Sequence, residues 1–398
     1  MTSAVVHSYE VWSWLIARKN WILVVILGFA SRVLIATLGH NLDFLAWTTN
    51  ATKLRDGGSV YDGHSPYGYG PIWMFVLRFA DLVQQTFPDN RKIFRLVIIM
   101  FLGSIDFLIA LLISKRFSTN LGMIFFINPI SIIITGYHNQ FDNLAIVIAI
   151  VAIALLGSEQ HEKFSRNHFV SLILLGLSLS VKQVLIFFPI WLFFRPAPIQ
   201  IRFQRLAVAY LLNFLAFVPW ATSIESIKTI IRDVYLMRRG RSGILLSLLG
   251  ADYAGTIHDA SYSDLARVLI FIVWIVTLIS FGWLMRKKPV MHSLIVYLVL
   301  MVALAPAYSQ QQLILPLVAV FVYATPELKL FYLLTLLFMI QNSDELGIEF
   351  FFPHFFRLNG TIYAWLQVLL ILFGLRFVMP KYFLAPKSKY LREALKDS

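Results

Sequence analysis

The stretch that decides the fold covers residues 21–47 and reads WILVVILGFASRVLIATLGHNLDFLAW. Its first part, Trp21 to Leu38, is an apolar run of the length that crosses a bilayer. Its second part is polar and carries Asp43 shortly after the run ends. The next clear apolar segment begins near Ile93, so residues 40–92 form a loop far longer than the ~2–6 residues of an ordinary connection. Loops of this length usually carry function.

The composition predicts an integral membrane protein. Of the 398 residues, 59% are hydrophobic and only 14% are charged, whereas a soluble domain has about 25% charged residues. The chain has no Cys, which excludes disulfides, thiol catalysis and Cys-bound metals. The net charge of +13 is typical of Lys and Arg retained in cytoplasmic loops, and we expect no nucleic-acid partner.

Apolar segments of spanning length recur along the whole chain. They predict an all-α fold: a polytopic transmembrane helical bundle of about twelve spans, forming a single domain over residues 1–398. The segments at 183–195 and 312–325 are short, and we expect broken or re-entrant helices there. The predicted spans are 21–39, 93–114, 120–137, 143–157, 168–182, 183–195, 205–222, 264–284, 290–306, 312–325, 328–342 and 359–380.

The distribution of Lys and Arg predicts the orientation in the membrane. An N-terminus in the cytoplasm puts most short basic loops, and the basic tail 376–396, on the cytoplasmic side, as the positive-inside rule requires. Both termini are then cytoplasmic, and the two long loops, 40–92 and 222–263, lie outside. The outer ends of other spans carry polar clusters at 136–143, 181–183 and 307–312.

Loop 40–92 is expected to contain two short helices lying on the membrane surface. The first covers Leu42–Asp56 and the second covers residues 71–85. Pro71 suits the first turn of a helix, and the apolar residues around Trp73 fit an interfacial helix. Between the two, YDGHSPYGYGP at 61–71 is rich in turn-forming residues.

Asp43 is the first candidate for chemistry, with His40 and Asn41 beside it. A carboxylate at the membrane surface is able to take a proton from a hydroxyl nucleophile in a transition state. The plainer interpretation is a solvated Asp that caps the helix starting near Leu42. Position alone does not decide between these interpretations.

The segment HNQFD at 138–142 gathers donors and acceptors for a polar ligand such as a sugar. His138, Gln140 and Asp142 are its candidate binding residues. One His and one Asp are too few ligands to predict a metal site. We therefore expect no cofactor, with a divalent metal left open. The alternative is simply a polar end of a span.

Lys182 is the most unusual single charge, because apolar residues flank the segment around it. An ionisable residue within a membrane is costly and marks a functional hypothesis. A phosphate at the outer interface would be a suitable counter-charge. The alternative is a Lys that extends to the outer surface along its apolar stem.

A group of arginines in loop 222–263 provides a second candidate anion site. Arg binds phosphate through bidentate, charge-assisted hydrogen bonds. Such a group also binds anionic lipid headgroups without specificity, and that alternative stays open. The residues are Arg232, Arg238, Arg239 and Arg241.

The order of these features resembles the GT-C superfamily of integral-membrane glycosyltransferases. HNLDFLAW at 40–47 is similar to the family's catalytic loop, and YGYGPIW at 67–73 to the turn before its second surface helix. HNQFDN at 138–143 and SVKQV at 180–184 resemble the His-x-Gln-Tyr/Phe and Lys-Gln elements of lumenal glucosyltransferases and related bacterial enzymes. Residues 307–312, AYSQQQ, stand where eukaryotic members carry a His-containing element.

The resemblance implies transfer of a hexose, mannose or glucose, from a polyprenyl-phosphate donor to a lipid-linked, glycan or protein acceptor. Asp43 would be the catalytic base, and Lys182 and the four arginines would bind the donor phosphate. Sugar and acceptor would be bound by His40, Tyr67, Tyr69, His138, Gln140 and Asp142. Trp73 would join the two tyrosines in stacking on a sugar ring or in lining the prenyl groove. The compact loops and missing Cys favour a bacterial inner membrane, with the active site on its external face.

Two other functions stay open at this stage. A multi-spanning transporter or lipid flippase would use Arg32, Asp106 and Lys182 along a pathway. A surface-polysaccharide polymerase or ligase would share the lipid-linked substrate but use a diphosphate carrier. The mechanism of sugar transfer requires Asp43 and Lys182 to face the same cavity.

Overall fold

The protein is almost entirely helical. The computed structural model describes residues 2–62, 67–88, 92–157, 165–236, 241–242, 264–305, 307–341, 362–383 and 388–395. Within these residues the only strands are β1 (Arg241–Ser242) and β2 (Ala307–Tyr308), which form one short antiparallel pair. The main helices are α1 (Thr2–Ala36), α2 (Leu42–Arg55), α3 (Ile72–Gln85), α4 (Lys92–Arg116), α5 (Thr119–Phe126), α7 (Asp142–Leu156), α8 (Arg166–Val181), α9 (Phe188–Phe194), α10 (Ile199–Phe217), α11 (Ile224–Thr229), α13 (Asp264–Leu284), α14 (Val290–Ala303), α15 (Leu317–Tyr323), α16 (Pro326–Gln341), α18 (Ile362–Val378) and α19 (Lys389–Leu395).

Three helical segments in the described part of the chain are long and apolar enough to cross a membrane: Lys19–Ala36, Lys92–Arg116 and Ile199–Trp220. A fourth is added if the bent pair Thr119–Phe126 and Pro129–Tyr137 is one span. Other apolar helices, such as α7, α8 and α14, are shorter. The all-helical prediction is confirmed, but the predicted count of about twelve spans is not.

The break in predicted span 120–137 has a local cause. Asn128 precedes Pro129 and caps the short helix α6 (Pro129–Ile132), its side chain accepting a hydrogen bond from the Ser131 amide. A π-helical turn, η1 (Ile133–Tyr137), follows, and the two halves meet at 42°. Proline restricts the residue before it to extended backbone, so the chain bends here. The expectation of broken helices at 183–195 and 312–325 agrees with the 3₁₀ turns η2 (Gln183–Leu185) and η6 (Gln310–Ile314), which precede α9 and α15.

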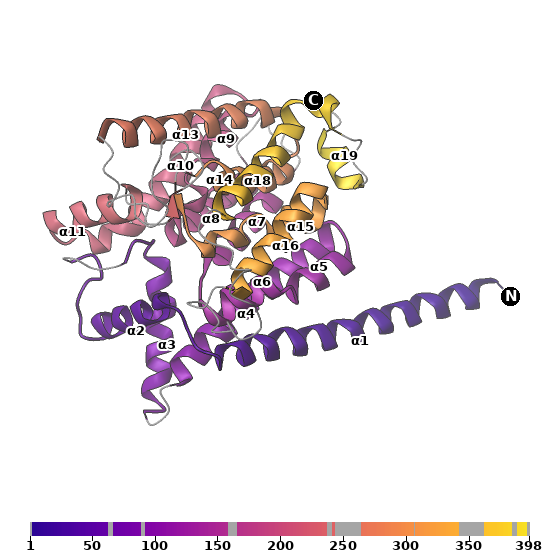
Figure 1. Ribbon diagram of the computed structural model, residues 1–398, viewed down its shortest axis with the longest axis horizontal. Helices are drawn as coiled ribbons and strands as arrows, with labels where there is room; N and C mark the ends of the chain where they lie inside the picture. The colour runs from indigo at the N-terminus through magenta and orange to yellow at the C-terminus, as the bar shows by residue number, and fades with distance from the viewer. Residues whose placement is uncertain are drawn as a thin grey trace.

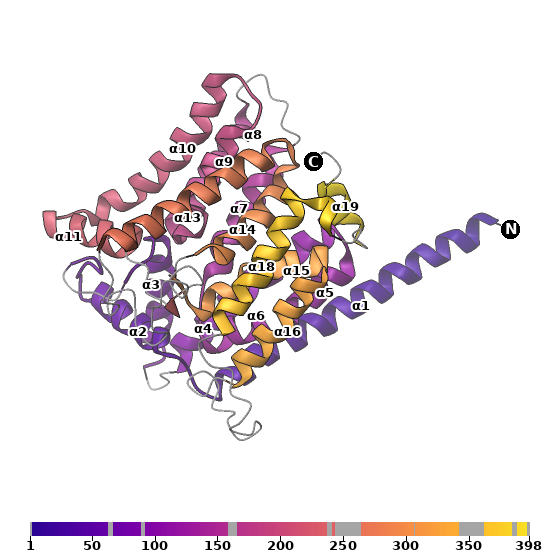
Figure 2. The ribbon, with the colours of Figure 1, turned by 45° about the horizontal axis from the view of Figure 1, so that its top comes forward.

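Helix α14 lies at the centre of the bundle, because nearly all of its side chains are buried. It packs against α7, α13, α15 and α18, and α7 packs in turn against α4 and α8. Figures 1 and 2 show α1 leaving the body of the molecule over its N-terminal part, while α10 and α13 lie along another edge.

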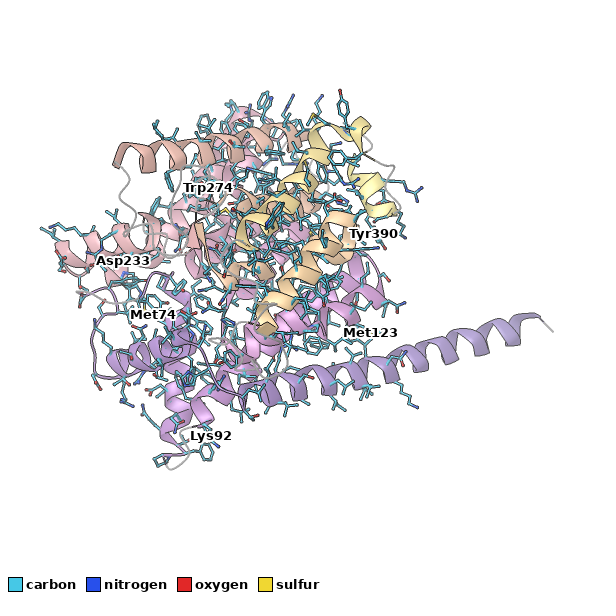
Figure 3. All side chains as sticks on the ribbon, in the orientation of Figure 1. Met74, Lys92, Met123, Asp233, Trp274 and Tyr390 are labelled. Atoms are coloured by element: carbon cyan, nitrogen blue, oxygen red, sulfur yellow. The ribbon has the colours of Figure 1, made fainter. Side chains whose placement is uncertain are left out.

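The outer helices expose apolar side chains. On α1 they include Ile22 and Ile26, on α10 Leu211 and Phe214, and on α13 Val276. Apolar residues facing outward in a contiguous set are typical of helices in contact with lipid rather than water. Figure 3 shows the side chains around the whole bundle.

The connections that carry the predicted site residues gather at one end of the bundle. Helices α4 and α7 begin at that end and run away from it, whereas α8 and α14 run toward it. Helices α2 and α3 of the first long loop pack on each other, and α3 packs on α4. Helix α3 is amphipathic: Trp73 and Leu77 are buried, while Phe75, Phe79 and Leu82 are exposed. This pattern agrees with the surface helix that the sequence predicts.

Candidate functional site

Asp43 lies in the first turn of α2, with its carboxylate held by the amide of nearby Asn41 and by two amides from distant parts of the chain. Its Oδ2 accepts hydrogen bonds from Asn41 Nδ2 at 3.0 Å, Gln140 Nε2 at 2.7 Å and Gln311 Nε2 at 3.5 Å. Asn41, not Asp43, occupies the N-cap position of α2, and its side chain makes no capping hydrogen bond. A negative charge in the first turn is also favoured by the helix dipole. Asp43 is therefore held in one orientation at a junction of three segments.

Arg95 fixes the position of the neighbouring loops. From α4 it donates to the backbone oxygens of Ala36 at 2.7 Å, Gly39 at 2.5 Å and Tyr137 at 3.3 Å. It also donates to Asn139 Oδ1 at 3.2 Å. Buried carbonyl groups need such partners, so this one side chain ties the end of α1 to the segment 136–139. Sequence analysis did not single out Arg95.

The segment 138–142 is buried and lies directly behind Asp43. Asn139 adopts a left-handed backbone conformation, with φ of 55°, and its carbonyl accepts a hydrogen bond from Trp47 Nε1 at 3.2 Å. His138 is 1% exposed, and its Nδ1 lies 2.8 Å from Asn41 Nδ2. The turn therefore directs His138 and Gln140 toward the start of α2.

Lys182 is buried and has a protein counter-charge. Its Nζ lies 2.6 Å from Asp142 Oδ2, and it also contacts the rings of Tyr69 at 5.0 Å and Phe141 at 5.2 Å. Lys182 is 6% exposed, so it does not extend to the outer surface. The expected counter-charge of Lys182 was an anion at the outer interface, such as a phosphate, whereas the structure supplies Asp142. Asp142, expected among the sugar-binding residues, is first of all the partner of this Lys.

Gln311 joins the two charged groups into one site. Its Nε2 lies 3.5 Å from Asp43 Oδ2, and its Oε1 accepts a hydrogen bond of 3.1 Å from Lys182 Nζ. Asp43 and Lys182, 139 positions apart in the printed sequence, thus face the same place. Sequence analysis noted the polar cluster at 307–312 but did not name Gln311. Its only signal was a run of three glutamines after a buried helix.

Several buried polar atoms around this place have no hydrogen-bond partner among the described residues. They are Asn41 Oδ1, Gln140 Oε1, Asp142 Oδ1 and Gln183 Nε2. Leaving a buried polar group unsatisfied costs about 1–3 kcal/mol. Three acceptors and one donor near a carboxylate and an ammonium group are suited to a ligand rich in hydroxyl groups.

The tyrosine-rich turn at residues 67–71 packs against the backbone next to Lys182. The Gly70 amide donates to the carbonyl of Val181 at 3.1 Å, and a Cβ on Gly70 would lie 1.9 Å from the carbonyl oxygen of Ser180. Only glycine permits this approach. The turn therefore rests on the backbone immediately before Lys182, which brings Tyr69 against the ammonium group.

Tyr67 and Trp73 lie in an aromatic core rather than on a ligand-facing surface. Both are 0% exposed. Trp73 stacks on Phe141 with ring centroids 4.2 Å apart, and the Tyr67 hydroxyl donates to Gly70 O at 2.8 Å. Burial raises the pKa of Tyr67 well above its usual value. The expected stacking on a sugar is thus open to Tyr69, which is half-buried, but not to Tyr67 or Trp73.

The remaining predicted residues are scattered. His40 is exposed and packs against Phe44, with ring centroids 5.1 Å apart. Arg232 is exposed and forms an ion pair of 2.7 Å with Asp233, so it does not join Lys182. Arg238 and Arg239 lie outside the described residues. The backbone of Arg241 pairs with Tyr308 in β1 and β2, which places this part of the basic loop beside the segment that leads to Gln311.

Arg32 and Asp106 form a closed ion pair inside the bundle. The Nη2 of Arg32 lies 2.6 Å from Asp106 Oδ2, and both side chains are 0% exposed. Ser131, Thr135 and Asn143 donate further hydrogen bonds to the Asp106 carboxylate. This network binds α1, α4, the broken helix and α7 together. Both side chains are fully enclosed by protein partners, whereas the transporter hypothesis expects them along a pathway.

Among the described residues, no group of three or more His, Asp or Glu side chains is arranged to hold a metal ion. No protein-family model matches the chain, and no curated protein matches its sequence.

Proposed function

We propose that the protein is an integral-membrane hexosyltransferase of the GT-C type, which uses a polyprenyl-phosphate sugar. The observation that carries this proposal is the convergence of Asp43 and Lys182 on Gln311. It combines a positioned carboxylate with a positioned cation, as acid–base chemistry next to a leaving phosphate requires.

In the proposed reaction, the hydroxyl oxygen of the acceptor attacks the anomeric carbon of the donor sugar. The bond between that carbon and the phosphate oxygen breaks, and polyprenyl phosphate leaves with the electron pair. Asp43 takes the proton of the attacking hydroxyl. Asn41 and Gln140 hold the carboxylate at 3.0 and 2.7 Å, so no reorientation is needed in the transition state.

Lys182 stabilises the charge that develops on the leaving phosphate. Its pairing with Asp142 at 2.6 Å lowers the cost of burying the ammonium group before the donor arrives. Arg241 is the arginine of loop 222–263 that would supply further positive charge, since its strand β1 pairs with β2. Mannose or glucose is the proposed sugar.

The proposed setting is a bacterial inner membrane, with both termini in the cytoplasm and the site on the external face. Two features support it. Apolar side chains cover the outer surfaces of α1, α10 and α13, and the end of the bundle opposite Asp43 carries Lys115, Arg116, Arg286 and Lys287, as the positive-inside rule expects of a cytoplasmic end.

A donor screen tests the proposal. Purified protein is incubated with a panel of polyprenyl-phosphate hexoses, and release of polyprenyl phosphate is measured. Asp43→Asn should lower release by about 10²–10⁴-fold. Asp62→Asn is the matched control, because it makes the same change at an exposed position of the same loop and should leave release unaltered. Full activity of Asp43→Asn would overturn the assignment of the base. Turnover of polyprenyl-diphosphate donors alone would favour the polymerase or ligase.

A further inference from the structure

A large basic cavity lies at the end of the bundle opposite Asp43. It has a volume of about 1160 Å³ and is formed where α4 and α7 end and where α14 begins. Helix α4 has 25 residues, which at ~1.5 Å per residue separates its two ends by roughly 35 Å. The cavity is thus a different place from the candidate site. In Figure 3, Lys92 at the start of α4 lies at the bottom of the view, well apart from Tyr390 at the right, whose hydroxyl donates to the carbonyl of Phe117 just past the end of α4.

Five of the residues that line this cavity are basic, and none is acidic: they are Lys115, Arg116, Arg195, Arg286 and Lys287. They come from three separate parts of the chain, so the fold, and not a single basic run, brings them together. Lys115, Arg116 and Lys287 enter none of the ion pairs found among the described residues. Like charges repel one another when gathered without counter-ions, so the cavity favours an anion.

The deeper wall of the same cavity is apolar. Leu112, Ile150 and Met291 line it, and they also line a small adjoining pocket of about 20 Å³. That second pocket is bounded by Leu294, Leu298 and Val318 and has Arg116 at its edge. A free phosphate would occupy only the basic mouth. A molecule with a phosphate head and an aliphatic chain matches both parts, because each part meets surface of its own kind.

We propose that this cavity binds one anionic phospholipid, with its phosphate among the five basic side chains and an acyl chain along Leu112, Ile150 and Met291. The lipid lies where α4 and α7 end and α14 begins. The site is independent of the proposed transfer reaction. It does not use Asp43, Lys182 or their neighbours.

The test measures retained lipid. Full-length protein is extracted from membranes, exchanged into detergent containing phosphatidylglycerol or phosphatidylcholine, and examined by native mass spectrometry. Wild-type protein should retain one phosphatidylglycerol molecule in preference to phosphatidylcholine. The double variant Lys115→Gln/Lys287→Gln should retain it at least about tenfold more weakly, since each surface Lys contributes measurably to binding an anionic headgroup.

Two further variants make the result specific. Lys329→Gln/Lys389→Gln removes two exposed lysines that do not line the cavity, and should retain the lipid like wild type. Ala154→Trp fills the cavity wall without changing charge and should also weaken retention. Equal retention by wild type and the Lys115/Lys287 variant would overturn the proposal. If millimolar inorganic phosphate displaced the lipid and Ala154→Trp left its retention unchanged, the cavity would be a phosphate site and not a phospholipid site.

Discussion

The side-chain amide of Gln140 donates a hydrogen bond of 2.7 Å to Oδ2 of Asp43, across 97 positions of sequence. The bond joins the first turn of α2 to the buried turn that precedes α7. Because Arg95 and Trp47 hold that turn from two other sides, the carboxylate of Asp43 has little freedom to rotate. The properties of Asp43 thus depend on residues that its own neighbourhood in sequence does not contain.

Replacing Gln140 with Leu should lower kcat/KM of sugar transfer by about tenfold to a hundredfold, because the carboxylate loses its closest donor and its orientation. The acid limb of the pH–rate profile should also move to higher pH, since a carboxylate without this N–H donor binds its proton more readily. Steady-state kinetics over a range of pH measures both effects.

Gln85→Leu is the control for this change. Gln85 makes the same kind of bond, 2.7 Å to Asp81 Oδ2, at the far end of α3. The Gln85→Leu variant should have the same pH–rate profile as wild type. An unchanged profile in Gln140→Leu would show that Gln140 does not position the base.

Substitutions of Lys182 and Asp142 should have coupled effects on stability, but the double variant should not recover activity. Asp142→Leu leaves a buried ammonium group without its counter-charge, and Lys182→Met does the same to the carboxylate. Each single change should cost about 3–5 kcal/mol. The double variant should be closer to wild type in its thermal unfolding midpoint, because no unpaired charge remains, but it should transfer no sugar.

A double-mutant cycle on the thermal midpoints measures this coupling. Additive losses would mean that the 2.6 Å contact is not an energetically coupled pair. Full transfer activity of the stable double variant would mean that Lys182 does not act on the leaving phosphate.

Gly70→Ala should loosen the tyrosine-rich turn. The new Cβ would meet the Ser180 carbonyl oxygen at 1.9 Å, and forcing atoms into packed space typically costs about 1–3 kcal/mol. We expect faster proteolysis between α2 and α3, together with reduced transfer because Tyr69 moves away from Lys182. Limited proteolysis followed by mass spectrometry locates the opened segment.

Gly57→Ala is the comparison for that experiment. Gly57 has φ of +80° but no atom within 4 Å of its added Cβ. Its cost is therefore conformational only, about 1–2 kcal/mol, and the turn at 67–71 should stay protected. If both variants open the same segment, close packing against Ser180 is not the cause.

Arg32 and Asp106 should prove structural. Arg32→Met or Asp106→Leu alone should destabilise the protein by about 3–5 kcal/mol, since each leaves a completely buried charge unpaired. The double variant Arg32→Met/Asp106→Leu should recover part of this loss and keep transfer within about threefold of wild type. Loss of transfer by a well-folded double variant would instead point to a role of this pair in function.

Part of the site could be predicted because polar residues beside or within apolar runs are evident in the sequence. Asp43 follows an apolar run of spanning length, and Lys182 interrupts another. Their partners were less visible: Gln311 and Asn41 are ordinary polar residues in polar segments, and Arg95 lies in a helix that begins with a basic turn. Their importance comes from distances of 2.5–3.5 Å between segments, and no local pattern encodes such distances.

The errors have the same origin. Tyr67 and Trp73 belong to a turn and a helix that sequence analysis expected at a surface, but the fold packs them at 0% exposure. The counter-charge of Lys182 was sought in a lipid because Asp142 lies 40 positions away. The predicted count of about twelve spans stays unconfirmed, because helices such as α7 are shorter than a segment that crosses a membrane by itself.

Local residue patterns in the sequence account for the helical, apolar character of the protein, the broken helices at 183–195 and 312–325 and the collection of polar segments after alternate helices. These follow from residue type and local spacing, because backbone preference and hydrophobicity act over a few residues. Only the tertiary structure decided that Asp43 and Lys182 share Gln311, that Asp142 balances Lys182, and that five basic residues enclose a cavity with an apolar wall. Those relations depend on how helices pack, which is set by the burial of side chains from the whole chain at once.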